Sequence, residues 1–280
     1  MNFRDQACKH LSQYKRNTLN IKEDGIFNYR GRKVPKSHIL PIDEQRKNIL
    51  KPYRDKFFVS EQSQIKFHKY FHHLNSSQAL CINLFYPLIA ESSLNLFLDY
   101  LNLPAETTGT CLFEKDSDLE IAARRTSFDF YLQTTSKNQI FVEVKYTEAG
   151  FGQAKKDLPH REKFKQTYLP ILKGVSDFLE PKCQNEELFL DHYQILRNLV
   201  HINDSDTVVL LFPSANSVVA EEAVYAKNHF LTEKGKDRFR IVYLEEFVSF
   251  LETQSSNCSL DGYYREFRKK YLPNIMTGAQ

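Results

Sequence analysis

The sequence predicts an α/β protein in which helices flank a mixed central sheet, and two observations lead to this prediction. Several short runs have the alternating or continuously apolar pattern of strands, and longer segments between them have apolar residues at helical spacing. Along the chain these elements follow the order strand, strand, strand, helix, helix, strand, helix, strand. This order indicates an α/β domain rather than an all-helical or all-strand one.

The N-terminal region differs from the rest of the chain in charge. Residues 1–75 hold 16 Lys and Arg but 7 Asp and Glu, a net charge of +9, whereas the remainder carries −6. Such an asymmetry is common in proteins that bind polyphosphate, although a solvated surface explains it equally well. We therefore expect a basic N-terminal extension, residues 1–75, packed on a core domain, residues 76–280.

Helices are predicted from apolar spacing and capping signals. Residues 1–60 are mostly polar and irregular, with turn signals at Asp24-Gly25 and Arg30-Gly31-Arg32. Ser76 or Ser77 can cap the next helix by accepting a backbone N–H, and Pro87 should kink that helix or end its first half. The other predicted helices span residues 43–53, 61–73, 94–101, 152–173, 186–200, 218–228 and 245–252.

Strands are predicted where the period changes to two or where a short apolar run is bounded by turns. Leu112-Phe113 begins the first strand, and the turn at residues 135–138 joins the next two. The run from Thr207 to Phe212 is almost wholly apolar, so we expect it to be buried on both faces. The strands after the first are predicted at residues 127–132, 139–146, 207–212 and 240–244.

The composition argues against several classes of protein. The 280 residues are 41% hydrophobic and 26% charged, which suits a folded chain with a sizeable core. The five cysteines are scattered without a CxxC pair, so we expect free thiols rather than disulfides or a zinc site. No secretory signal or membrane-spanning run is found, and we expect a soluble cytoplasmic protein. No nucleotide cofactor is expected, because the sequence has no Walker A or dinucleotide-binding motif.

Glu143-Val144-Lys145 is the strongest chemical signal in the sequence. Alternate residues of a strand share a face, so Glu143 and Lys145 should project together while Val144 projects to the opposite side. Burying charges within an apolar strand is costly unless they are paired or bind a metal. The charged residues of this strand therefore indicate a functional site.

Asp129 repeats this pattern in the preceding strand, where it lies between Phe128 and Phe130. Pairing of the two strands can place Asp129 beside Glu143, and a divalent cation with oxygen ligands relieves the repulsion between two carboxylates. Lys145 beside that cation can orient or help to deprotonate a water for attack on phosphorus. The three residues predict metal-assisted hydrolysis of phosphodiester bonds. A cross-strand ion pair at a sheet edge is the alternative interpretation.

These motifs together resemble the PD-(D/E)XK nuclease superfamily and its α-β-β-β-α-β core, although Phe128 stands where the superfamily usually has proline. More narrowly, several segments resemble the bacterial PGN_0703-like restriction endonucleases. These segments are Gly31…His38-Ile39-Leu40-Pro41, Ser76-Ser77-Gln78-Ala79…Asn83-Leu84-Phe85, Glu143-Val144-Lys145-Tyr146-Thr147-Glu148, Gln194…Arg197-Asn198 and Leu211-Phe212-Pro213. The resemblance implies Mg²⁺-dependent cleavage of DNA, with Mn²⁺ as a substitute. It assigns the metal to Asp129, Glu143 and Val144, and the action on water to Lys145.

Two further residues are candidates for the catalytic set. Members of the superfamily often add an acidic residue from the first helix, and Glu91 is the candidate because it shares a helical face with Asn83 and Pro87. A solvent-facing Glu at a helix end explains Glu91 equally well. Gln194 and Arg197 lie one turn apart on a later helix. Gln194 is a candidate for the metal site and Arg197 for a phosphate, with surface or packing roles as the alternatives.

Basic residues outside this set are the expected DNA contacts. They are Arg30, Arg32, Lys33 and Lys36 in the extension, and Lys155 and Lys156 after the third strand. We expect a restriction-type endonuclease that cleaves double-stranded DNA as a homodimer, because a two-fold dimer matches a palindromic site. The alternatives are a structure-specific DNA repair nuclease and a non-catalytic nucleic-acid-binding protein on the same fold.

Overall fold

The computed structural model describes residues 2–104, 108–120, 125–254, 260 and 262–272. The chain forms two compact units. Unit 1 comprises residues 1–103 and 244–280, and unit 2 comprises residues 104–243. The predicted division into an extension, residues 1–75, and a core domain, residues 76–280, stays a prediction, because the compactness of the units does not test it.

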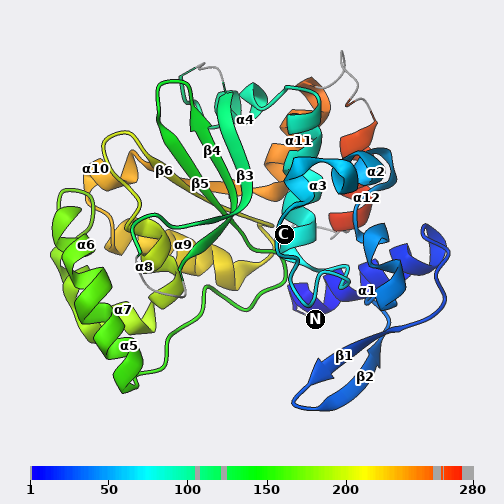
Figure 1. The fold of residues 1–280 in the computed structure, drawn as a ribbon, viewed down its shortest axis with the longest axis horizontal. Helices are drawn as coiled ribbons and strands as arrows, with labels where there is room; N and C mark the ends of the chain where they lie inside the picture. Colours follow the sequence, from blue (N-terminus) through cyan, green and yellow to red (C-terminus); the bar gives the residue numbers. More distant parts are fainter. Residues whose placement is uncertain (1, 105–107, 121–124, 255–259, 261, 273–280) are drawn as a thin grey trace, which may run out of the picture. The chain divides into compact units, whose positions relative to one another are not determined.

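Unit 2 is built on the predicted mixed sheet, which has five strands (Figure 1). They are β3 (Thr108–Asp116), β4 (Ser127–Thr134), β5 (Gln139–Val144), β6 (Thr207–Phe212) and β7 (Phe239–Tyr243). Neighbours in the sheet follow the order of the chain. The pairs from β3 to β5 are antiparallel, whereas those from β5 to β7 are parallel. β5 is thus the central strand. All six residues of β6 are buried, as predicted for a strand covered on both faces.

The helices of unit 2 are shorter than predicted, because two long helical patterns are divided. They are α5 (Leu158–Lys163), the π-helical turn η3 (Phe164–Tyr168), α6 (Leu169–Gly174), η4 (Pro181–Gln184), α7 (Glu186–Asp191), α8 (Tyr193–Leu199), α9 (Ser217–His229) and α10 (Glu233–Lys236). The π-helical turn directly precedes Leu169-Pro170, where proline has no N–H to continue the α-helical ladder. Apolar residues of α8 and α9 share one core with Phe128 of β4 and Phe141 of β5.

Unit 1 is mainly helical, with a small hairpin. Its helices are α1 (Phe3–Asn17), η1 (Ile42–Asn48), α2 (Lys51–Val59), η2 (Glu61–Ser63), α3 (Ser77–Ala90), α4 (Asn95–Tyr100), α11 (Leu244–Gln254) and α12 (Tyr263–Tyr271), and its hairpin joins β1 (Gly25–Tyr29) to β2 (Arg32–Lys36). Ser76 caps α3 as predicted, since its side chain accepts a hydrogen bond from Ala79 N. The helix continues past Pro87 to Ala90, so Pro87 does not end it. The alternative, a kink at Pro87, stays a prediction.

The N-terminal 75 residues contain more regular structure than predicted. Helix α1 buries Ala7, Leu11 and Tyr14 at helical spacing. The turn signal at Arg30-Gly31 closes a hairpin, because both residues have positive φ angles, 48° and 79°, as a two-residue hairpin turn requires.

The helix predicted at residues 61–73 is wrong beyond its first turn, η2. The side chain of Gln78 accepts a hydrogen bond from His68 N at 2.9 Å and donates one to Lys66 O at 3.1 Å. These bonds satisfy backbone groups that a helix would otherwise pair internally. A distant side chain thus stabilises an irregular conformation here.

The described residues also bear on two expectations from composition. Cys8, Cys81, Cys111 and Cys183 have free thiols, while Cys258 lies outside the described residues. Within the described part of the chain, no helix has both the length and the apolar character needed to cross a membrane.

Candidate functional site

The ion pair of Glu143 and Lys145 is buried at the centre of the sheet of unit 2. Lys145 Nζ lies 2.8 Å from Glu143 Oε1, so the two side chains share a face, as strand alternation requires. Glu143 is only 4% exposed and Lys145 only 7%. Because β5 has two strands on either side, this pair is not the exposed ion pair at a sheet edge that the alternative interpretation requires.

Asp129 joins this pair from the neighbouring strand β4. The register pairs Tyr131 with Phe141 and Phe130 with Val142, so the next step along β4 places Asp129 opposite Glu143. Just beyond the paired residues, Val144 N–H donates a 2.7 Å hydrogen bond to Oδ2 of Asp129. This bond fixes the carboxylate of Asp129 against β5.

The two carboxylates are only partly satisfied by protein donors. Lys145 Nζ and Gln194 Nε2 both bind the same oxygen of Glu143, Oε1, at 2.8 and 3.1 Å. Asp129 accepts its hydrogen bond through Oδ2. Among the residues that the structure describes, none donates to Glu143 Oε2 or Asp129 Oδ1. Each carboxylate therefore keeps an oxygen that can bind a cation.

The electrostatics of Asp129 favour an added positive charge. Burial raises the pKa of Asp129 well above its ordinary value, and the charges of Glu143 and Glu114 raise it further. Lys145 and the Val144 N–H act in the opposite direction but do not balance these effects. The ionised form of Asp129 is thus under-compensated, which is the condition that a bound divalent cation relieves.

Lys145 is held in its charged form. Burial alone would lower the pKa of Lys145, but the nearby charges of Glu143, Glu148 and Asp129 outweigh burial and raise it. An ammonium group with a raised pKa donates hydrogen bonds and does not accept a proton near neutral pH. Lys145 can therefore orient a water or stabilise developing negative charge.

Glu114 and Glu148 are acidic neighbours whose placement the sequence did not reveal. Glu114 lies on β3 between the pairs Phe113–Phe130 and Lys115–Phe128, which puts it opposite Asp129. Its φ angle of 53° is left-handed, and this break in the strand conformation is invisible in the sequence. Glu148 accepts a hydrogen bond from Tyr146 N.

A metal at this site would depend on few protein ligands. Among the described residues, no group of three or more His, Cys, Asp and Glu side chains is arranged to hold a metal ion. Asp129 and Glu143 provide two carboxylate ligands, so backbone oxygen or water would have to complete the coordination. Such a ligand set suits Mg²⁺, which usually keeps several waters and binds proteins through one or two carboxylates.

Gln194 and Arg197, one turn apart on α8, reach different clusters. Gln194 donates to Glu143, and its backbone N–H reaches Gly152 O at 3.4 Å. Arg197 instead binds the buried carboxylate of Glu120 at 3.2 Å. The predicted contact between Arg197 and a phosphate stays a prediction, and the described conformation commits its guanidinium to Glu120.

Glu120 is the centre of a second buried cluster. Its carboxylate accepts hydrogen bonds from the backbone N–H and hydroxyl of Thr126, from Tyr168 OH at 2.8 Å, and from Lys163 Nζ at 3.2 Å, in addition to Arg197. Burial alone would raise the pKa of Glu120, but these donors and charges lower it to about 2. This carboxylate is fully satisfied by the protein.

The remaining candidates make other contacts in the two units. Glu91 belongs to unit 1, where it accepts a 3.0 Å hydrogen bond from Tyr53 OH and lies 3.6 Å from Lys56 Nζ. Its predicted catalytic role stays a prediction. In unit 2, Lys155 is exposed, whereas Lys156 is paired with Asp191 and Glu187.

The four basic candidates of unit 1 all lie on the β1–β2 hairpin. They are Arg30, Arg32, Lys33 and Lys36, and all four are exposed. The hairpin projects from the helices of unit 1 in Figure 1. Its segment from Gly25 to Lys36 contains no acidic residue, so its positive charge is not neutralised locally.

Comparison with known proteins gives one match. A family model described as "Restriction Endonuclease associating with ARP" matches residues 8–272, a range that includes every candidate site residue. No curated protein and no solved structure matches the chain significantly. The match supports the resemblance to restriction endonucleases. The assignment to the PD-(D/E)XK superfamily and the narrower PGN_0703-like resemblance stay predictions.

Proposed function

We propose that this chain, which belongs to the family of restriction endonucleases associating with ARP, is a restriction-type enzyme that cleaves double-stranded DNA with the help of a divalent cation. Membership of this family supports a restriction-endonuclease-like nuclease. The observation that supports the proposed chemistry is the pairing of Asp129 and Glu143 at the centre of the sheet, each with a carboxylate oxygen that no described residue binds.

Asp129, Glu143 and the backbone carbonyl of Val144 would hold the cation. The N–H and C=O of one strand residue point to the same side, and the Val144 N–H faces Asp129. The Val144 carbonyl should therefore face the same side as the carboxylate. We propose Mg²⁺ as the natural ion and Mn²⁺ as a substitute, because hard cations prefer oxygen ligands. When bound, the cation supplies Lewis-acid polarisation of the phosphate.

Lys145 and Gln194 prepare the site for hydrolysis. Lys145 remains an ammonium, so we assign it the tasks of orienting the attacking water and stabilising negative charge that develops on the phosphate. Gln194 donates a hydrogen bond to Oε1 of Glu143 and so restricts the rotation of the carboxylate. The other oxygen, Oε2, is thereby held in one direction for the cation. Gln194 is thus a positioning residue, acting through Glu143.

The β1–β2 hairpin is the proposed DNA-binding surface. A two-stranded β-ribbon fits the major groove of B-DNA, and Arg30, Arg32, Lys33 and Lys36 provide exposed charges for phosphates and base edges. We also propose that the enzyme acts as a cytoplasmic homodimer, since two-fold symmetry matches a palindromic target.

Plasmid digestion tests the proposed function. We expect discrete fragments in Mg²⁺, no cleavage in EDTA, and cleavage that is abolished or slowed at least about 10²-fold by Asp129→Ala, Glu143→Ala or Lys145→Ala. Lys173→Ala, which removes an exposed lysine of the same unit, is the matched control and should cleave normally. Equal cleavage in EDTA, or by a folded Lys145→Ala variant, would contradict the proposal. Cleavage of branched oligonucleotides but not of plasmid would indicate a repair nuclease instead.

A further inference from the structure

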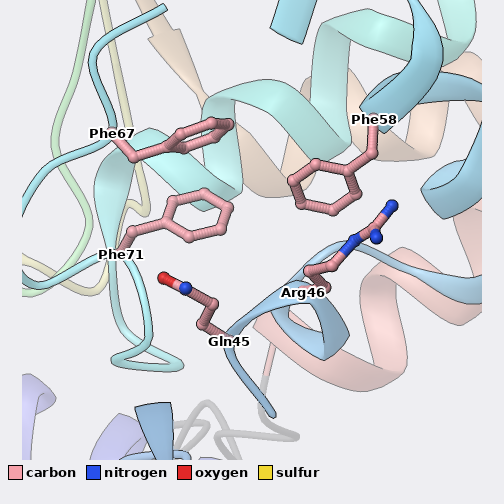
Figure 2. Close-up of a pocket in the computed structure, with 5 residues that line it drawn as sticks. All are labelled: Gln45, Arg46, Phe58, Phe67 and Phe71. Atoms are coloured by element: carbon pink, nitrogen blue, oxygen red, sulfur yellow. The ribbon is translucent and has the colours of Figure 1, made fainter. Parts of the chain in front are cut away.

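A cavity of about 310 Å³ in unit 1 has three phenylalanine rings and two polar side chains in its wall (Figure 2). Gln45 and Arg46 come from η1, Phe58 comes from α2, and Phe67 and Phe71 come from the irregular segment before α3. We infer that this cavity binds a single base of a nucleic acid strand. This inference rests on the proposed function for the class of its ligand.

The aromatic rings provide an apolar wall in which neighbouring rings are tilted against one another. The ring centroids of Phe67 and Phe71 are 4.7 Å apart, and those of Phe58 and Phe67 are 6.0 Å apart. Phe58 and Phe67 are half-buried, so part of each ring faces the cavity rather than the core. Bases stack on aromatic side chains whatever their identity, because every base has a π-face.

Arg46 and Gln45 select for a base over other ligands of aromatic cavities. The guanidinium carbon of Arg46 lies 4.3 Å from the Phe58 ring centroid, and Figure 2 shows the Gln45 amide directed towards Phe71. The positive charge of Arg46 opposes a quaternary ammonium ligand, for which aromatic cages are otherwise suited. The guanidinium of Arg46 and the amide of Gln45 can form hydrogen bonds with the polar edge of a base. An entirely apolar ligand would leave these two groups without partners.

The wall of the cavity is fixed by buried hydrogen bonds. Asn48, fully buried in the same turn as Gln45 and Arg46, donates to Phe71 O at 2.6 Å and to His73 O at 2.7 Å. These bonds tie η1 to the segment that carries Phe71. A preformed cavity binds its ligand without the cost of ordering the wall.

The surrounding charge favours a base that belongs to a polynucleotide. Lys66 and Lys69, on either side of Phe67, are exposed, and residues 1–75 carry a net charge of +9. Such a surface attracts a strand of phosphates far more strongly than it attracts one free nucleotide. The occupant should therefore be an unpaired or extruded base of such a strand.

The absence of tryptophan from the sequence allows a direct test. In Phe67→Trp, the new indole forms part of the cavity wall and should be quenched when a base stacks on it. The probes are short single-stranded DNA oligonucleotides, titrated in EDTA to prevent cleavage. The matched probe is an abasic oligonucleotide of equal length and charge. We expect quenching by the first and little or none by the second.

Variants in the reporter background test the role of Arg46. Arg46→Ala should weaken base-dependent quenching about tenfold or more. Lys47→Ala is the control, because it removes one charge from the same turn but its ammonium is paired with Glu44.

Tyr225→Trp, which places an exposed indole on unit 2, is the control for the reporter and its fluorescence should not respond to the base. If Phe67→Trp does not fold, Phe58→Trp serves as the reporter.

Each outcome bears separately on the cavity and on the nuclease. Equal quenching by base-containing and abasic DNA overturns the inference. Quenching by free mononucleotides at the same concentrations at which oligonucleotides quench also overturns it. DNA binding without any indole response overturns it while leaving the proposed function intact. Base-dependent quenching in a protein that cleaves no DNA with any divalent cation supports the cavity and contradicts the proposed function.

Discussion

Glu120 and Glu143 are buried glutamates of the same unit, but their surroundings are opposite. Glu120 accepts hydrogen bonds from four side chains and one backbone N–H, and its pKa falls to about 2. Glu143 has two side-chain donors on one oxygen, lies opposite Asp129, and contributes to raising the pKa of that aspartate. Burial is common to both sites, so burial does not distinguish them. The two sites differ instead in the number of hydrogen-bond donors around each carboxylate.

The difference separates a structural anion from a cation site. A carboxylate whose oxygens are all occupied stabilises the fold but has no lone pair to offer a metal. Two adjacent carboxylates with unoccupied oxygens are unfavourable until a cation binds between them. Helix α8 supplies both clusters, since Gln194 serves Glu143 and Arg197 serves Glu120. Substitutions in each cluster should therefore have separable effects on cleavage and on stability.

The largest expected effect is the loss of cleavage when the Glu143 cluster is changed. Lys145→Ala should lower the initial rate of plasmid cleavage in Mg²⁺ by about 10²- to 10⁴-fold, because it removes the ammonium that orients water and stabilises charge. Loss of one partner of a buried ion pair should also lower the melting temperature. Circular dichroism can verify that the variant is still folded at the assay temperature. Glu187→Ala, an exposed substitution in the same unit, is the control. A folded Lys145→Ala enzyme with wild-type rates would remove Lys145 from the mechanism.

The Glu120 cluster should affect stability instead of chemistry. Glu120→Ala leaves the largely buried cations of Arg197 and Lys163 without their anionic partner. The free energy of unfolding, measured by denaturant titration, should therefore fall by about 3–5 kcal/mol. Because the folded pKa of Glu120 is below its ordinary value, its stabilisation is complete above pH 4.5 and is lost as pH falls from 4.5 towards about 2. A variant as stable as the wild type at neutral pH would contradict the comparison.

Gln194 tests whether positioning of Glu143 matters. Gln194→Leu removes the hydrogen bond to Glu143 Oε1 at similar side-chain size and should weaken Mg²⁺ binding about tenfold, the lower end of the range for residues that orient metal ligands. Saturating Mg²⁺ should restore much of the activity, which a purely structural defect would not allow. Gln153→Leu, an exposed substitution, is the control. An unchanged Mg²⁺ requirement would show that Lys145 alone fixes Glu143.

The smallest expected effect is a gain in stability from Asp129→Asn. Without metal, this substitution removes a charge opposite Glu143 and should raise the free energy of unfolding by about 0.5–2 kcal/mol. Because the folded pKa of Asp129 is raised, the contribution of its neutral form is present at low pH and lost as pH rises through the folded pKa. The advantage of the Asp129→Asn variant over the wild type should therefore grow with pH. Equal stability across the pH range would show that Asp129 is not strained.

Much of this site could be predicted from local patterns. The alternation of residues 139–146 is enough to place Glu143 and Lys145 on one face, and the short turn at residues 135–138 is enough to pair the strand of Asp129 with that of Glu143. Helical spacing predicts only that Gln194 and Arg197 lie one turn apart, and the contact of Gln194 with Glu143 depends on how α8 packs. Each of these inferences depends only on the period of a strand or helix and on a hairpin connection.

The remainder depends on contacts that sequence patterns do not encode. Glu114 lies opposite Asp129 through the register of β3 and β4, at a residue with a left-handed backbone conformation, and its charge raises the pKa of Asp129. Gln78 stabilises the irregular conformation within residues 61–73 through hydrogen bonds to backbone groups about ten residues away. Helix α1 is different, because its buried apolar residues do have helical spacing in the sequence. The many polar residues between them obscure this pattern. Register, backbone outliers and side-chain clamps become visible only in three dimensions.

Calorimetric titration of the nuclease with Mg²⁺, in parallel with Asp129→Asn and Glu143→Gln, tests the cation site most directly. We expect saturable binding to the wild type that weakens as pH falls, because protons compete with the cation for Asp129. Neither variant should bind detectably under the same conditions. Wild-type affinity in both variants would contradict the assignment of the cation to these two carboxylates.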